Sequence, residues 1–145
     1  MLLNIPAIIP PELLMALDKM GHTDEIVIAD CNYPALSMSR ECTIKEPIYV
    51  KGATVPQMMD AVLSLIPLDY REQKSFIGVK PLDSNEQYPV HDEYPVVLSK
   101  HGYGEDRIQF LSKPEFYSRA EHAFCVVVTG EKSKFANVII RKGIV

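Results

Sequence analysis

Apolar residues recur along this chain with two periods, one typical of helices and one typical of strands. Leu13, Leu17 and Met20 form one helical face behind a pair of prolines, and Gly21 is expected to end the helix in a left-handed conformation. Directly afterwards, the unbroken apolar run 26–29 predicts a short strand buried on both faces. The first thirty residues therefore predict a helix followed by a core strand.

The rest of the chain repeats this alternation. Thr54-Val55-Pro56-Gln57 reads as a capping box with proline in the first turn, and the helix that it begins is stopped by Pro67. Another helix is expected at 114–122. Further strands are expected at 75–80, 107–111, 123–129 and 138–141.

Three prolines make 81–95 the expected loop, and Pro95 leaves open whether 90–101 is helical. Because strands alternate with helices, the sequence predicts one domain over residues 1–145. Its expected architecture is a layered α/β/α sandwich with a mostly parallel or mixed central sheet.

Composition supports a folded protein and narrows its partners. Hydrophobic residues make up 47% of the 145 residues and charged residues 23%. The 15 basic and 19 acidic residues form no long run, so we expect neither a nucleic-acid footprint nor attraction to anionic membranes. The chain also lacks an apolar stretch of the ~18 residues that span a bilayer and the charged start of a secretory signal.

Cysteine usage indicates a reducing compartment. Cys31, Cys42 and Cys125 cannot all pair within one chain, and none belongs to a CxxC motif. Reduced thiols in the cytoplasm are the simplest interpretation. Cys125 lies in an apolar run and is expected to be buried.

Two polar residues flank the first strand and form the candidate acid/base pair. His22 precedes the strand, and Asp30 follows its carboxyl end, where open α/β sheets usually place ligands. Histidine near neutral pH can both donate and accept a proton, and a carboxylate beside it can assist. Each residue also has a plain structural interpretation: His22 as a helix-capping residue, and Asp30 as a cap for the following loop.

No motif indicates a bound metal or a common nucleotide or hydrolase site. His91, His101 and His122 show no metal-ligand spacing with a cysteine or carboxylate, so no metal is expected. GxGxxG, P-loop, GxSxG and HExxH patterns do not occur. Reasoning from the residues alone thus stops at an α/β domain with a possible His/Asp proton-transfer site.

Several segments together resemble a known family. They are Met-Gly-His-x-Asp-Glu at 20–25, Ala-Asp-x-Asn-x-Pro at 29–34, Phe-Tyr-x-Arg-Ala at 116–120, and Thr-Gly-Glu at 129–131. The residues of these segments and their order along the chain resemble the fucose mutarotase and ribose pyranase family, and the last two segments resemble its fucose branch. The resemblance implies an isomerase of free monosaccharides that needs no cofactor. It also implies a cytoplasmic protein that assembles into a cyclic homo-oligomer, often a decamer, with pockets at subunit contacts.

The resemblance also assigns roles to single residues. His22 matches the catalytic histidine and Asp30 the substrate-binding aspartate, which would also help to set the protonation of the imidazole. Asn137 matches the asparagine of a Tyr-Gly-Asn element whose tyrosine is Phe135 here. Lys113 lies where relatives carry a basic residue.

In this interpretation Lys113 and Asn137 bind sugar hydroxyls. Phe135, together with Tyr117 or Tyr33, stacks against the apolar face of the sugar. Asn137 could instead be an ordinary turn residue, and Phe135 a core residue.

Three functions remain open on these grounds. The first is interconversion of the α and β anomers of L-fucose. The second is a D-ribose pyranase that changes ring size. The third is a non-catalytic sugar-binding accessory protein. This function remains open because Phe135 replaces a tyrosine, and a phenyl ring cannot relay a proton as a phenol can.

Overall fold

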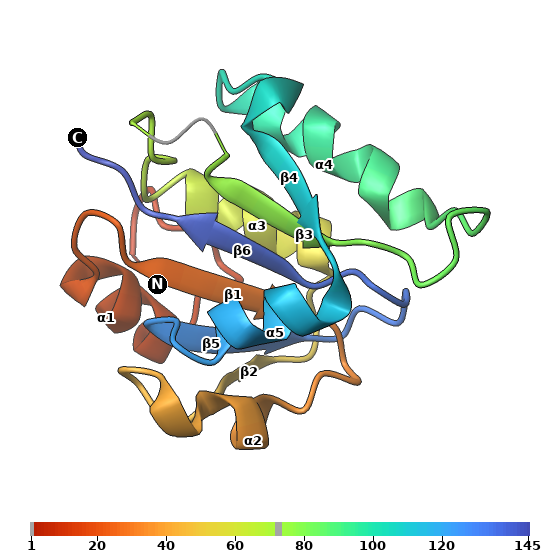
Figure 1. Cartoon of the computed structure of the whole chain (residues 1–145). Helices are drawn as coiled ribbons and strands as arrows, with labels where there is room; N and C mark the ends of the chain where they lie inside the picture. The colour runs from red at the N-terminus through yellow and green to blue at the C-terminus, as the bar shows by residue number, and fades with distance from the viewer. Residues whose placement is uncertain (1, 72–73) are drawn as a thin grey trace.

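One sheet of six strands separates two helical layers in this computed structural model, which describes residues 2–71 and 74–145 (Figure 1). The strand order is β2-β5-β1-β6-β3-β4. β6 is antiparallel to its neighbours β1 and β3, and the other strand pairs are parallel, which confirms the expected mixed sheet. The strands are β1 (Glu25–Ala29), β2 (Ile48–Val50), β3 (Phe76–Val79), β4 (Ile108–Leu111), β5 (Cys125–Thr129) and β6 (Val138–Arg141).

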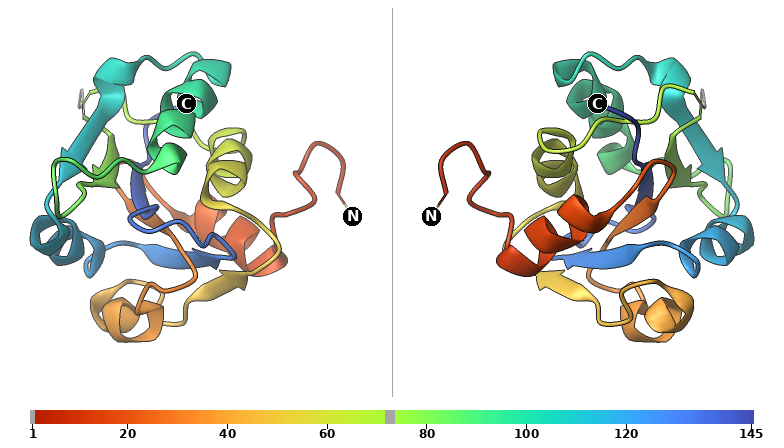
Figure 2. Two further views of the ribbon diagram at one scale, coloured as in Figure 1. Left: turned by 90° about the vertical axis from the view of Figure 1, so that its right-hand side faces the viewer. Right: turned by 90° about the vertical axis from the view of Figure 1, so that its left-hand side faces the viewer.

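Two hydrophobic cores lie on opposite faces of this sheet. Ile26 and Ile28 of β1 belong to the core beneath the first helical layer, whereas Val27 and Ala29 belong to the core beneath the second. β1 is therefore buried on both faces, as its unbroken apolar run predicts. The first layer contains α1 (Pro11–Lys19), α3 (Val55–Leu63) and α4 (Pro89–Lys100), and the second contains α2 (Ala35–Met38) and α5 (Lys113–Ala120) (Figure 2).

Local hydrogen bonds define the start of α3 and follow the end of α1. In α3 the Gln57 N–H donates to the Thr54 hydroxyl at 3.3 Å and the Thr54 N–H donates to Gln57 Oε1 at 2.9 Å, so the predicted capping box is confirmed. α1 ends differently from the prediction. Met20 is extended, and Gly21 is not left-handed but donates its N–H to Asp24 at 2.7 Å.

The loop expected at 81–95 is wrong from Pro89 onward, because α4 begins there and contains Pro95. A proline inside a helix loses one backbone hydrogen bond and crowds the preceding turn. Val90, Tyr94, Val97 and Leu98 nevertheless form one buried face of α4. Burial of that face against the sheet outweighs the local cost. The short elements β2 and α2 were not predicted.

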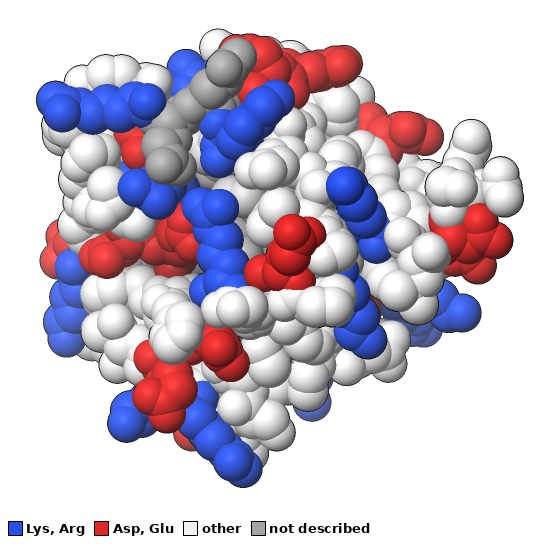
Figure 3. Space-filling view, in the orientation of Figure 1, with Lys and Arg blue, Asp and Glu red and all other residues white. Residues whose placement is uncertain are grey.

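The topology places particular side chains at the two edges of the sheet. β1, β3, β4 and β5 end at one edge, where β6 begins, and we call it the carboxyl edge. The opposite edge, where β1 begins and β6 ends, is the amino edge. The described part of the chain has no helix both long and apolar enough to cross a bilayer. On the face seen in Figure 3, basic and acidic side chains are interspersed.

Candidate functional site

All the residues assigned to a sugar site except His22 line one small pocket at the carboxyl edge. We call this cavity of about 170 Å³ the carboxyl-edge pocket. It draws on segments far apart in the chain, because the end of β1, the end of β3, the start of α5 and the approach to β6 meet there. Its lining residues are Asp30, Asn32, Tyr33, Val79, Lys113, Tyr117, Lys134, Phe135 and Asn137.

Asp30 and Asn137 form a reciprocal hydrogen-bonded pair at the base of this pocket. The Asp30 N–H donates to Asn137 Oδ1 at 2.8 Å, and Asn137 Nδ2 donates to Asp30 Oδ2 at 2.9 Å. The Asn32 N–H donates to Asp30 Oδ1 at 2.8 Å. Asp30 is 5% exposed and Asn137 6% exposed, so the pair is held in a nearly dry site. Asn137 is therefore more than an ordinary turn residue.

Burial and hydrogen bonding act on the Asp30 carboxyl in opposite directions. Burial raises its pKa above the usual value, and the hydrogen bonds donated by Asn32 and Asn137 offset that rise only in part. A buried carboxylate with its oxygens oriented in this way can accept a hydrogen bond from a hydroxyl of a bound ligand.

Aromatic rings form one wall of the pocket. The Tyr33 and Tyr117 rings meet edge to face with centroids 5.4 Å apart, and Lys113 Nζ lies 5.3 Å from the Tyr117 centroid. The Tyr33 hydroxyl is buried and has no hydrogen-bond partner among the described residues. Phe135 is half-buried and lines the pocket, so it is not simply a core residue. Apolar ring faces beside charged and amide groups suit a ligand with an apolar face and several hydroxyls.

His22 lies at the amino edge, away from this pocket. β1 runs between His22 and Asp30, and its five residues at about 3.3 Å each span roughly 16 Å. The expectation that the two residues form one acid/base pair therefore does not hold within a single chain.

His22 has a buried carboxylate partner that the sequence did not reveal. Its Nε2 lies 3.3 Å from Oδ1 of Asp69, which is 1% exposed. Arg141 Nε donates to the other oxygen of Asp69 at 3.2 Å, and the Arg71 N–H donates to Oδ1 at 3.0 Å. No local motif marks Asp69, because its contact with His22 joins residues 47 positions apart.

Asp69 determines which ring nitrogen of His22 carries the hydrogen. Burial acts to raise the pKa of the Asp69 carboxyl, but the hydrogen bonds from Arg71, His22 and Arg141 outweigh burial and hold the pKa below its usual value. The ionised carboxylate can only accept, so His22 Nε2 carries the hydrogen in this contact and Nδ1 carries a lone pair in the neutral ring. The side chain of His22 is 33% exposed, so its ring is accessible from outside the chain.

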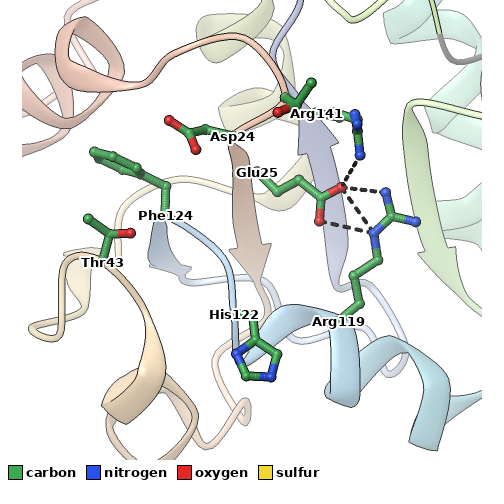
Figure 4. Close-up of a pocket in the computed structure, with 8 residues that line it drawn as sticks. Asp24, Glu25, Thr43, Arg119, His122, Phe124 and Arg141 are labelled. Carbon is green, nitrogen blue, oxygen red and sulfur yellow. Dashed lines mark hydrogen bonds and ion pairs between the residues drawn. The ribbon is translucent and has the colours of Figure 1, made fainter.

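A larger cavity of about 460 Å³, the amino-edge pocket, is lined by Thr23, which follows His22, and by Arg141, which donates to Asp69. Figure 4 shows the residues around it. In Figure 4, Arg119 and Arg141 both turn toward Glu25. Arg119 Nε lies 3.0 and 2.9 Å from the two Glu25 oxygens, and Arg141 lies 3.6 Å from one of them. The charged side chains at the centre of the amino-edge pocket thus already pair with one another, since Glu25 of β1 contacts Arg119 of α5 and Arg141 of β6. We therefore take the carboxyl-edge pocket as the candidate binding site.

Across residues 2–71 and 74–145, no three His, Cys, Asp or Glu side chains gather in a way that could hold a metal ion.

Comparison with known proteins gives a consistent set of similarities. A model of the RbsD / FucU transport protein family matches residues 3–145. Fucose mutarotase of Homo sapiens is 43% identical over 145 residues, which cover 97% of this chain and 92% of that protein. The crystal structure of the fucose mutarotase from Streptococcus pneumoniae in complex with L-fucose has a TM-score of 0.91 and 35% identity, covering 99% of both chains. Bacillus subtilis RbsD complexed with D-ribose shares the fold, with a TM-score of 0.70, 22% identity and 94% coverage of both chains.

Proposed function

The chain belongs to the RbsD / FucU transport protein family, and we propose that it is a mutarotase that interconverts the α and β anomers of L-fucose. Its similarity to relatives named fucose mutarotase supports the fucose activity over a ribose pyranase, because the ribose-bound relative shares the fold at lower identity. The observation that carries the proposal is the buried Asp30–Asn137 pair beside the aromatic wall of a pocket in this fold.

The reaction needs proton transfer but no strong electrophile. In ring opening, a base takes the proton of the anomeric hydroxyl and an acid protonates the ring oxygen, so the C1–O5 bond breaks and a free aldehyde forms. Rotation about C1–C2 and the reverse transfers close the other anomer. Because the hemiacetal is already labile, general acid/base help of about 100- to 10,000-fold suffices.

We assign the proton transfers to His22 and the orientation of its imidazole to Asp69. Asp30 would accept a hydrogen bond from one sugar hydroxyl, and Lys113 and Asn137 would bind others. Phe135 and Tyr117 would cover the apolar face of the sugar. Without a phenol at position 135, an ordered water can provide the second proton path.

We further propose that one complete site takes His22 from one copy of the chain and Asp30 from another. Their separation along β1 supports this, since one monosaccharide cannot contact both within a chain. The pocket volume of about 170 Å³ is also below the roughly 300 Å³ of ordinary small-molecule sites, as expected of a pocket that is completed by a partner. A cyclic homo-oligomer such as a decamer would supply that contact to every copy.

We place the activity in the cytoplasm. Cys31, Cys42 and Cys125 are free thiols, which fits a reducing compartment.

NMR exchange between anomeric protons tests the activity directly. Wild-type protein is expected to speed exchange between α- and β-L-fucose at neutral pH, and His22→Ala is expected to slow the catalysed rate about 100-fold or more. D-ribose serves as the comparison sugar. If the protein accelerates anomeric exchange of neither sugar but binds L-fucose saturably, the result would instead favour a sugar-binding accessory protein.

Mixing two inactive variants tests the shared site. Asp30→Ala and His22→Ala are each expected to be inactive as pure assemblies. Co-expressed in equal amounts, they would restore about a quarter of the sites, because a wild-type His22 then faces a wild-type Asp30 at some contacts. Failure of every mixture to regain activity, with both variants folded and assembled, would mean that one chain supplies both groups.

A further inference from the structure

The chain has an unfavourable backbone conformation at the wall of the carboxyl-edge pocket. Phe135 has a φ of 57°, in the left-handed region that bulky residues rarely adopt. Such a conformation persists where the surrounding structure holds it in place, and it is common at functional sites. Phe135 lines the pocket and lies two residues before Asn137.

Two side chains of α4 hold the backbone at this point. His91 Nε2 lies 2.8 Å from the carbonyl oxygen of Phe135, and the Tyr94 hydroxyl donates to the carbonyl oxygen of Ala136 at 2.9 Å. A carbonyl can only accept, so His91 Nε2 is the donor. Two consecutive carbonyls on the pocket segment are thus bound by residues three positions apart on one helix, which is one helical turn.

The donors are themselves held firmly. Tyr94 is fully buried, and its ring meets Phe76 edge to face with centroids 5.4 Å apart. The His91 ring lies 5.4 Å from the Tyr94 ring and 5.0 Å from that of Phe110. The ring of Tyr88, just before α4, packs against the Phe135 ring with centroids 5.1 Å apart. Neither donor can move without disturbing several packed rings.

We propose that Tyr94 and His91 are positioning residues for the sugar pocket, holding Phe135 and Ala136 so that the Asn137 amide faces Asp30. The Asn137 amide both donates to and accepts from Asp30, and therefore depends on the exact direction of the backbone that precedes it. The role of this pocket in sugar binding rests on the function proposed above. The geometry of the segment does not.

Hydrogen exchange measured without sugar tests the positioning. The reporter is the Asp30 amide, because it donates to Asn137. Tyr94→Phe removes only the hydroxyl, and we expect the Asp30 amide to exchange about 5- to 10-fold faster relative to amides at the centres of β1 and β5. The Kd for L-fucose is expected to rise by a similar factor.

Val97→Ala is the matched control. Val97 is a buried residue of α4, so its truncation lowers stability without removing a donor to the pocket segment. We expect its melting temperature to fall while the ratio of Asp30 exchange to strand exchange and the Kd stay at their wild-type values. His91→Ala is expected to act like Tyr94→Phe, whereas His91→Gln, which keeps a donor, is expected to recover most of the wild-type behaviour.

Unchanged relative exchange in both Tyr94→Phe and His91→Ala would overturn the proposal, since α4 would then support only the fold. Faster Asp30 exchange with an unchanged Kd would also overturn it, because the displaced amide would not matter for the sugar. Failure of the wild type to bind L-fucose would refute the proposed function instead. Faster exchange would in that case still support positioning of Asn137.

Discussion

Replacing Asn137 by aspartate sets two buried carboxyl groups against each other. In the wild type, Asn137 Nδ2 donates to Asp30 Oδ2 at 2.9 Å, and both residues are nearly inaccessible to solvent. Asn137→Asp keeps the size and the oxygen that accepts from the Asp30 N–H. It replaces the donor by a second oxygen, and two carboxylates about 3 Å apart cannot both ionise.

The variant must therefore hold one proton between the two groups. The pKa of this shared proton in the folded state is raised above the value of about 4 for an unfolded aspartate. Stability is then fully present below the unfolded pKa and is lost as pH rises through the folded pKa. At pH 8 the penalty approaches that of an uncompensated buried charge, about 3–5 kcal/mol, or roughly 10–15 °C in melting temperature for a chain of this size. At pH 5 the protonated carboxyl introduced at position 137 can donate as the amide does, and the loss falls to about 1 kcal/mol.

Thermal melting of variant and wild type from pH 5 to pH 8 measures this difference. The difference between the two proteins, not the variant alone, carries the test, because other groups titrate as well. Asn32→Asp is the matched control, since it makes the same chemical change beside Asp30 on an exposed side chain. We expect it to shift stability by less than about 0.5 kcal/mol at either pH. A gap between Asn137→Asp and the wild type that is constant across this range would refute the buried pairing on which the site is built.

Four further predictions follow from particular contacts. Phe135→Tyr should leave the fucose exchange rate equal or raise it about fivefold through one new hydrogen bond, whereas Phe135→Ala should weaken L-fucose binding in a titration; unchanged binding in the alanine variant would remove Phe135 from the site. Gly130→Ala should lower the melting temperature sharply, because a Cβ at Gly130 would lie 2.1 Å from the Lys51 carbonyl oxygen, and a normal melt would contradict that packing. Pro95→Ala should stabilise the protein by about 1 kcal/mol or more in denaturant unfolding, since it restores a donor inside α4 and relieves crowding; a loss of stability would show that α4 requires the proline. Exhaustive chelation should leave anomeric exchange unchanged, because side chains alone supply the proposed proton transfers, and loss of activity restored by one added metal would disprove this.

Patterns close together in the sequence determined much of the fold. The buried strand β1, the capping box of α3 and the terminal strand β6 depend on neighbouring residues and on hydrophobic patterns that any solution of the fold must bury. The position of Asp30 after a buried strand also predicted its place at the carboxyl edge, because the ends of parallel strands meet there. Family resemblance then named Lys113, Tyr117, Phe135 and Asn137, and the structure brings these four beside Asp30.

Only the tertiary structure decided the features that depend on distant partners. α4 forms in spite of Pro95 because its buried face packs on the sheet. Local helix propensity does not include the stabilisation that this packing provides. Asp69 meets His22 from 47 positions away, and Tyr94 binds the Ala136 carbonyl from 42 positions away. His22 and Asp30 are close in sequence but are held apart by the extended strand between them, since a strand places its two ends as far apart as its residues allow.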